Sequence, residues 1–177
     1  METGESGSPR STILPDMALR EIRTEGDPIL SKVSKPVKAM TPRLAELIAD
    51  MWETMDAEEG VGLAAVQVGI LKRLFIVKTD EEHAYTFINP EILSTEGEQT
   101  GSEGCLSVPG KAGNVTRPNK VKIKAWDENM QEFVLEGEEL LARAICHEND
   151  HLDGKLYLDL VEGELVDVND PEEEENG

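Results

Sequence analysis

The sequence predicts an α+β fold in which antiparallel sheets wrap around one central helix. Three observations indicate this class: a helix with a strong start signal after residue 41, a series of short strands in the middle of the chain, and a second helix over 137–152. Helices and strands that occupy separate stretches of a chain are typical of α+β domains. The 177 residues are enough for one domain with its own core, and no repeat or linker divides them.

The first helix is expected over residues 42–58. Thr41 is a favourable N-cap residue, and Pro42 suits the first helical position because no helix hydrogen bond needs its nitrogen. Apolar side chains then recur at helical spacing, at Leu44, Leu47, Ile48, Met51 and Met55. This spacing predicts one buried face that belongs to the core, and Gly60 ends the helix.

Short strands are expected at 72–78, 84–89, 91–95, 119–127 and 131–136. Asn89 and Pro90 separate the second strand from the third, because proline has no N–H to donate within a sheet. The last two strands form a hairpin around Glu128 and Asn129, since apolar residues alternate with lysines before this turn.

The second helix is expected over 137–152 and stops at Gly154, and one more short strand is expected around 165–168. We divide the chain into a disordered N-terminal extension at 1–16, a folded domain at 17–161 and an acidic C-terminal tail at 162–177. The tail carries eight acidic residues and no basic one, a composition that favours disorder over a packed core.

The composition excludes several functional classes. The formal net charge of −20 repels phosphate groups, so direct binding to nucleic acid or to an anionic membrane is not expected. No apolar run reaches the roughly 18 residues that a membrane-spanning helix needs. Two cysteines are too few for a disulfide framework, and the N-terminal residues do not resemble a signal peptide. We therefore expect a protein of the reducing cytoplasm.

Two histidines four residues apart, His147 and His151, lie on the second helix with Glu148 between them. Residues at this spacing stand on one helix face with Cβ atoms about 5–6 Å apart, so two imidazoles can bind one metal ion. The glutamate is placed to act on a water molecule at that ion. The alternative interpretation is an ordinary acidic helix that exposes two histidines.

A hydrolytic metal site needs a third protein ligand and one open position for water. Cys105 is the candidate, because it follows Gly104 on open backbone between strands, where a thiolate can approach the helix. Alternatively, Cys105 is a small buried hydrophobic residue, as free cysteines often are. Tyr157 stands where a longer motif would continue with a histidine and is a poor ligand. Cys146 points about 100° away from its helical neighbour His147 and is expected to pack in the core.

Three separated segments resemble the signature motifs of peptide deformylases: GVGLAAVQ at 60–67, EGCLS at 103–107 and HENDH at 147–151. Their order and spacing are also similar to that family, and the short gap between the first two motifs resembles its compact bacterial subclass. The resemblance implies a hydrolase that removes the formyl group from formyl-methionine at the start of nascent polypeptides and releases formate. Residues 17–161 would then be the catalytic domain.

The resemblance also implies roles for particular residues. One divalent metal ion per chain would be Fe²⁺ in the cell, with Zn²⁺, Ni²⁺ or Co²⁺ as replacements, and its ligands would be Cys105, His147 and His151. Glu148 would transfer protons. Gln67 and the backbone N–H of Leu106 would stabilise the oxyanion, although Gln67 could also be a surface amide.

By the same resemblance, the substrate peptide lies as an added strand beside Val61, Gly62 and Gly104. Its methionine side chain would enter a pocket lined by Leu106, Leu140, Ala144 and His147. Backbone recognition of this kind tolerates varied side chains beyond the first residue. Leu140 and Ala144 could equally be plain core residues.

Formyl-methionyl nascent peptides are the expected partners of a monomeric enzyme. Some relatives end in a partly basic helix that helps them dock on the ribosome, whereas this chain ends in an acidic tail, so only a transient ribosome contact is expected. Two other functions fit parts of the pattern: a metallopeptidase that cuts internal peptide bonds, and a non-enzymatic binding domain stabilised by a metal. A purely structural metal site requires neither Glu148 nor Gln67, which argues against the second.

Overall fold

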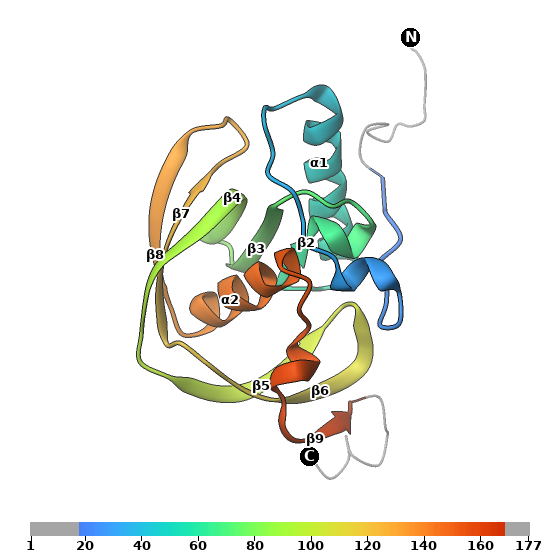
Figure 1. The fold of residues 1–177 in the computed structure, drawn as a ribbon, viewed down its shortest axis with the longest axis vertical. Coiled ribbons are helices and arrows are strands. Elements are labelled where there is room, and N and C mark those ends of the chain that lie inside the picture. The colour runs from blue at the N-terminus through green and yellow to red at the C-terminus, as the bar shows by residue number, and fades with distance from the viewer. Residues whose placement is uncertain (1–17, 169–177) are drawn as a thin grey trace.

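The computed structural model describes residues 18–168, which form two antiparallel sheets and two α-helices (Figure 1). The elements are η1 (Pro28–Ser31), α1 (Pro42–Ala57), β2 (Gly62–Ala64), η2 (Ala65–Val68), β3 (Leu74–Asp80), β4 (His83–Glu96), β5 (Gln99–Cys105), β6 (Val108–Arg117), β7 (Lys120–Trp126), β8 (Glu132–Glu138), α2 (Leu140–Leu152), η3 (Tyr157–Leu160) and β9 (Glu162–Asp167). The extension expected at 1–16 and the end of the acidic tail, from residue 169 on, lie outside the described residues.

The two sheets surround α2, as the sequence predicts. One sheet has the strand order β2-β3-β4-β7-β8 and the other has the order β5-β6-β9, and all paired strands are antiparallel. Figure 1 shows α2 in the middle of the molecule, with β4, β7 and β8 curving past one side and β5 and β6 below it. Among the helices of residues 18–168, none is long and apolar enough to cross a membrane.

Helix α1 confirms the start signal at its N-terminus. The Thr41 hydroxyl accepts a hydrogen bond from the backbone N–H of Leu44 over 3.1 Å, and Pro42 occupies the first helical position. The predicted apolar face is buried, and it packs into a core cluster that includes Leu63 of β2 and Ile76 of β3. This packing holds α1 against the five-stranded sheet.

Helix α2 begins at Leu140, three residues later than expected. Residues 137 and 138 instead extend β8, where Gly137 pairs with Val121 of β7. A Cβ atom on Gly137 would lie 2.9 Å from the Leu141 side chain, so glycine lets the helix pack closely on the strand. The predicted stop is confirmed, because Gly154 has a φ of 78° and follows the end of the helix at Leu152.

The predicted break at Asn89 and Pro90 is wrong, since β4 runs through both residues. The pairing of β4 with β7 shifts register between Ile88 and Glu91, which is the pattern of a β-bulge. Asn89 has a φ of 51°, and its side-chain amide exchanges two hydrogen bonds of 2.8 Å with the backbone of Val37. The bulge accommodates the proline without ending the strand.

The second sheet was mostly absent from the sequence-based expectations. Strands β5 and β6 are rich in glycine and polar residues and lack a strong alternating pattern. The strand expected at 165–168 lies instead at Glu162–Asp167, where it pairs with the middle of β6. Every residue of β9 is exposed, so backbone pairing rather than burial of a face defines this strand.

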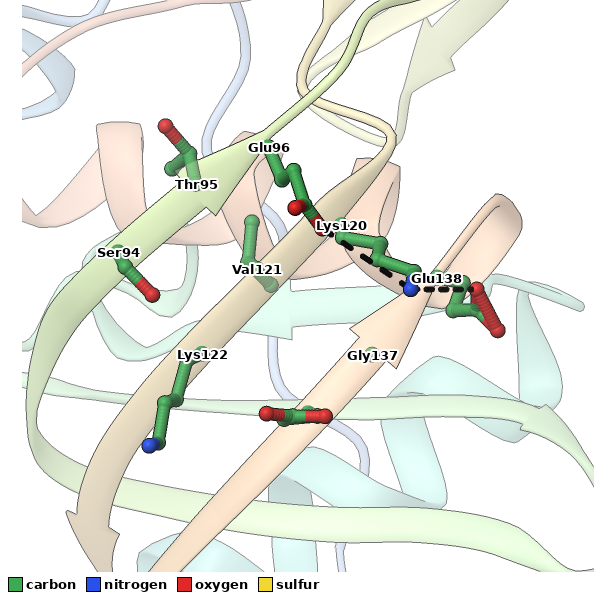
Figure 2. A pocket seen from close by; sticks show the side chains of 9 residues that line it. Ser94, Thr95, Glu96, Lys120, Val121, Lys122, Gly137 and Glu138 are labelled. Atoms are coloured by element: carbon green, nitrogen blue, oxygen red, sulfur yellow. Dashed lines mark ion pairs between the residues drawn. The ribbon is translucent and has the colours of Figure 1, made fainter.

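The outer face of the five-stranded sheet carries a polar hollow over β4, β7 and β8 (Figure 2). Lys120 bridges Glu96 and Glu138 there, with N···O distances of 3.9 and 3.7 Å. Exposed pairs of this kind contribute no more than about 1 kcal/mol to stability. None of the residues that the sequence predicts for the site lines this hollow.

Candidate active site

The structure brings together the three residues predicted to bind a metal ion. His147 and His151 are buried on one face of α2, with ring centroids 5.0 Å apart. Cys105 ends β5, and its Sγ lies 3.4 Å from Nε2 of His151. One ligand atom from each of the three residues lies within 4.8 Å of the other two. Residues 46 positions apart thus meet at a single point.

A buried carboxylate orients the first of these histidines. Glu103 Oε1 accepts a hydrogen bond of 2.8 Å from Nδ1 of His147. Because the proton sits on Nδ1, the lone pair of Nε2 is left to face the cysteine and the second histidine. The ring of Tyr157, 5.9 Å away between centroids, packs against the same imidazole. The orientation of His147 is therefore fixed on both sides.

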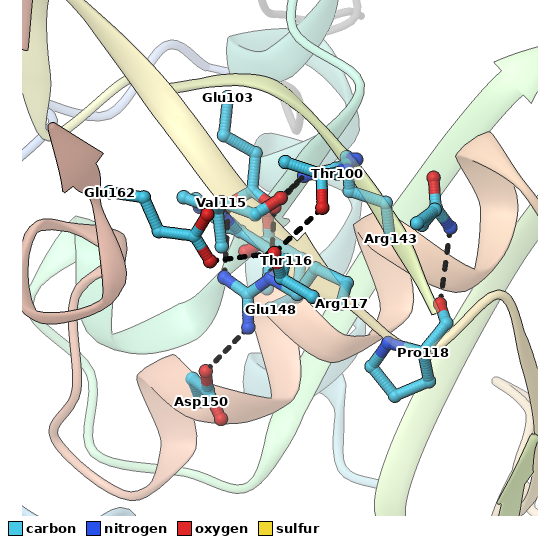
Figure 3. A network of polar contacts seen from close by, with 12 residues as sticks. Thr100, Glu103, Val115, Thr116, Arg117, Pro118, Arg143, Glu148, Asp150 and Glu162 are labelled. Carbon is cyan, nitrogen blue, oxygen red and sulfur yellow. Dashed lines mark hydrogen bonds and ion pairs between the residues drawn. The ribbon is translucent and has the colours of Figure 1, made fainter. Parts of the chain in front are cut away.

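Two arginines hold Glu103 in its ionised form (Figure 3). Arg117 donates to both carboxylate oxygens over 2.8 and 2.9 Å, and Arg143 donates to Oε2 over 2.7 Å. Burial alone would raise the pKa of Glu103, but the hydrogen bonds from Arg117 and His147 lower it to about 2. Arg117 also donates to Asp150 over 2.8 Å, which ties β6 to α2. The network therefore keeps a negative charge behind His147.

Glu148 lies beside the predicted metal ligands, with Oε2 at 3.9 Å from Nε2 of His147. Its other oxygen, Oε1, is buried and has no hydrogen-bond partner within residues 18–168. Burial raises the pKa of Glu148 to about 7, so the carboxyl group exchanges its proton near neutral pH. This is the property that a general acid and base requires.

Gln67 lies behind the cysteine and is buried. Its Oε1 accepts a hydrogen bond of 2.9 Å from the backbone N–H of Ala64, which fixes the side-chain amide. Nε2 donates to the Ser107 hydroxyl over 3.0 Å and lies 3.6 Å from Sγ of Cys105. The alternative that Gln67 is a surface amide is therefore wrong, and its N–H groups point toward the cysteine end of the site.

A cavity of about 290 Å³ opens in front of these residues. It is lined by Gly60, Val61, Gly62, Ser102, Glu103, Gly104, Cys105, Leu106, Leu140, Arg143, Ala144, His147 and Glu148. All five residues predicted to bind substrate are in this set, together with Leu106. Gln67 and His151 do not line the cavity and lie deeper.

Four residues that line the cavity were not predicted from the sequence to do so: Gly60, Ser102, Glu103 and Arg143. Helical spacing could have found Arg143, which is three residues after Leu140 and four before His147. Glu103 could have been noticed only as a neighbour of Cys105. Cys146 is buried in the core, as predicted, and burial raises its thiol pKa to about 11.

The donor set fits a divalent transition metal. A thiolate and two imidazoles suit zinc and iron, and three protein ligands would leave a coordination position for water or substrate. The carboxylate partner of His147 is the type of group that commonly orients a metal-binding histidine. Cys105, His147 and His151 would hold the ion, which would act as a Lewis acid on whatever enters the cavity.

Comparison with known proteins identifies the family. A family model described as polypeptide deformylase matches residues 19–165. The chain belongs to this family. A peptide deformylase from Agathobacter rectalis is 61% identical over 152 residues, covering 86% of this chain and 96% of the relative. One from Lachnoclostridium phytofermentans is 58% identical over 161 residues, covering 90% of this chain and 99% of the relative.

Solved deformylase structures share the fold. A peptide deformylase from Legionella pneumophila superposes with a TM-score of 0.79 at 43% identity, covering 82% of this chain and 87% of that one. A deformylase from Thermotoga maritima gives a TM-score of 0.80 at 37% identity, covering 82% of this chain and 99% of that one. One from Synechococcus elongatus, solved with actinonin, gives 0.79 at 37% identity, covering 89% of this chain and 86% of that one.

Membership establishes the class of reaction. Deformylases are metal-dependent hydrolases of protein biosynthesis that act on nascent peptides beginning with formyl-methionine. The family assignment supports the function that the three motifs predict. It argues against the two alternatives, a metallopeptidase that cuts internal bonds and a non-enzymatic binding domain.

Proposed function

We propose that this chain removes the formyl group from formyl-methionyl nascent polypeptides at one divalent metal ion held by Cys105, His147 and His151. The observation that carries the proposal is the approach of the three ligand atoms to within 4.8 Å of one another, at the wall of a cavity that also contains Glu148. A cation in this position would polarise the formyl oxygen and acidify a water molecule.

Glu148 performs the proton transfers. Its carboxylate accepts a proton from the attacking water, whose oxygen forms a bond to the formyl carbon. When the carbon–nitrogen bond breaks, Glu148 gives that proton to the departing amine, so the products are formate and a free N-terminus. A pKa of about 7 suits both steps, because the group can hold and release a proton near neutral pH.

The oxyanion that develops on the formyl group is stabilised by the Gln67 amide and the backbone N–H of Leu106. The Gln67 amide is held by Ala64 and directed toward the sulfur of Cys105. Leu106 directly follows Cys105 and lines the cavity. Donors held in place before the reaction stabilise the charge without having to reorganise.

The substrate backbone lies as an added strand beside Val61, Gly62 and Gly104. Val61 and Gly104 are exposed at the rim of the cavity, where backbone groups are accessible to a peptide. The first side chain enters between Leu140 and Ala144 on the face of α2. Main-chain recognition explains how one enzyme processes many different nascent chains.

We infer that Fe²⁺ is the ion used in the cell, and that Zn²⁺, Ni²⁺ and Co²⁺ can occupy the same ligands. The enzyme acts as a monomer in the cytoplasm, where formylated chains emerge from ribosomes. The net charge of −20 opposes tight binding to ribosomal RNA, so the contact with ribosomes is transient. Cosedimentation with ribosomes at physiological salt, without other factors, would overturn this last inference.

The decisive experiment is anaerobic purification followed by measurement of formate release from formyl-Met-Ala-Ser, with the metal content determined on the same sample. We expect about one metal ion per chain, and formate release that a chelator abolishes and Fe²⁺ restores. Cys105→Ala should abolish both metal binding and turnover. Cys146→Ala is the matched control, since its sulfur lies in the core and should affect neither.

A further inference from the structure

One wall of the active-site cavity carries a guanidinium group that has no direct part in the proposed proton transfers or in the contacts to the oxyanion. Arg143 lies on α2 one helical turn before His147 and lines the cavity beside Leu140 and Ala144. Residues 140, 143, 144 and 147 share one helix face. Leu106, Leu140 and Ala144 are apolar, so Arg143 supplies hydrogen-bond donors to a mainly apolar region that would receive the first substrate side chain.

Only part of this guanidinium is engaged by the protein. Nη1 donates to Glu103 Oε2 over 2.7 Å and to the carbonyl oxygen of Val115 over 3.1 Å. Nη2 lies over Gly101, where an added Cβ atom would come within 3.4 Å of it. Neither Nε nor Nη2 has a hydrogen-bond partner among residues 18–168, and neither is fully enclosed. The N–H groups on these two nitrogens are therefore not used by the described residues, and Arg143 itself lines the cavity.

The electrostatic surroundings select the kind of group that these donors would bind. Glu103 offsets the charge of Arg143 (Figure 3), and Glu148 lines the same cavity. A negatively charged side chain would meet two carboxyl groups there, so an anion is disfavoured. A neutral group with a strong acceptor oxygen meets no such repulsion. The thioether of methionine is only a weak acceptor, whereas its sulfoxide carries a strongly polar oxygen.

We propose that Arg143 allows this enzyme to deformylate chains whose first residue is formyl-methionine sulfoxide, by donating a hydrogen bond to the sulfoxide oxygen. The inference rests on the proposed function and extends it to an oxidised substrate. The bond changes are those of ordinary deformylation: water adds to the formyl carbon, the carbon–nitrogen bond breaks, and formate and a free amine form. The sulfoxide is unchanged, so no oxidant or reductant takes part.

The test compares kcat/KM for formyl-Met-Ala-Ser and for the same peptide with methionine sulfoxide at the first position. In the wild-type holoenzyme, we expect the sulfoxide peptide to react within about tenfold of the methionine peptide. Arg143→Met replaces the guanidinium with an apolar side chain and should lower the sulfoxide-to-methionine ratio by about tenfold, the effect of losing one hydrogen bond to a charged donor.

Arg117→Lys is the matched control. Arg117 binds the same Glu103 carboxylate but does not line the cavity. Any effect transmitted through Glu103 to His147 should slow both peptides equally, so the ratio should stay at its wild-type value. A change in the ratio for Arg143→Met alone would therefore report a contact with the substrate side chain.

An unchanged ratio in Arg143→Met would overturn the proposal. So would a wild-type enzyme that cleaves the methionine peptide but cleaves the sulfoxide peptide more than about tenfold more slowly, and this comparison decides the question even if the variant fails to fold. Failure of the proposed function itself is distinguishable, because neither peptide would then release formate.

Discussion

Gly62 and Glu148 are in contact with no space for a side chain between them. A Cβ atom built on Gly62 would lie 2.5 Å from Oε2 of Glu148 and 2.8 Å from its Cγ. Strand β2 therefore packs directly against the glutamate that lies beside the predicted metal ligands. Glycine is therefore required at position 62 because a larger side chain would displace Glu148, and not only because of the path of the backbone.

Substitution of this glycine should disable the site while the fold persists. In Gly62→Ala, Glu148 has to move away from His147, so we expect kcat to fall by two or more orders of magnitude, the usual contribution of a general acid and base. Formate release from formyl-Met-Ala-Ser and metal content measure the effect. Gly97→Ala is the control, because a Cβ atom at Gly97 would lie 3.4 Å from the nearest side chain, that of Asn119. The φ of 69° at Gly97 means that this variant protein should be less stable than the wild type but should keep its active site intact. A fully active Gly62→Ala would contradict the assigned role of Glu148.

Removal of the Glu148 carboxylate should slow turnover without reducing metal binding. Glu148→Gln keeps the shape of the side chain but cannot accept a proton, so formate release should fall by about 10² to 10⁴. The three predicted ligands are unchanged, and metal content should therefore remain near one ion per chain. Loss of the ion in this variant would show instead that Glu148 is needed to hold the metal.

The side-chain amide of Gln67 should affect the rate of turnover more than the binding of the metal ion. In Gln67→Ala the oxyanion loses one donor, and one such donor contributes roughly 2.7–4 kcal/mol in other enzymes. We expect kcat to fall by about 10² to 10³ with little change in metal content. Ser107→Ala is informative beside it, because Ser107 accepts a hydrogen bond from the same amide and should have a smaller effect. Equal effects of both changes would argue for a purely structural role of Gln67.

The sequence was sufficient for the parts of the site that have a local pattern. The spacing of His147 and His151 places both on one helix face, and the motif that contains Cys105 supplied the third candidate ligand. It was not sufficient for the network behind them, because Glu103 finds Arg117 and Arg143 at separations of 14 and 40 residues, and no local pattern records those pairings. The continuous β4 was missed for a related reason, since the contact between Asn89 and Val37 that supports the bulge spans 52 residues.

The buried carboxylate of Glu103 should make the free energy of unfolding depend on pH in the acid range. Its pKa falls from 4.5 to about 2 in the folded protein, a change equivalent to about 3 kcal/mol. Because the folded value is the lower one, this stabilisation is present above pH 4.5 and is lost as the pH falls toward 2. Urea unfolding of the metal-free protein between pH 3 and pH 6 should show a weaker pH dependence for Glu103→Gln than for the wild type. Exposed Glu132→Gln should follow the wild type, and a common slope for all three proteins would contradict the prediction.

The identity of the bound ion should decide how the enzyme survives in air. A ferrous ion is readily oxidised, and a thiolate ligand that borders the open cavity is accessible to the same oxidants, so the iron form should lose activity under air and keep it under nitrogen. The nickel form should keep its activity in both atmospheres. Mass spectrometry of the inactivated iron form should locate oxidation at Cys105 and not at Cys146, because burial raises the pKa of the Cys146 thiol to about 11 and leaves little thiolate at neutral pH. Equal decay of the iron and nickel forms, or oxidation confined to Cys146, would show that the exposed ligand and its ion are not the vulnerable point.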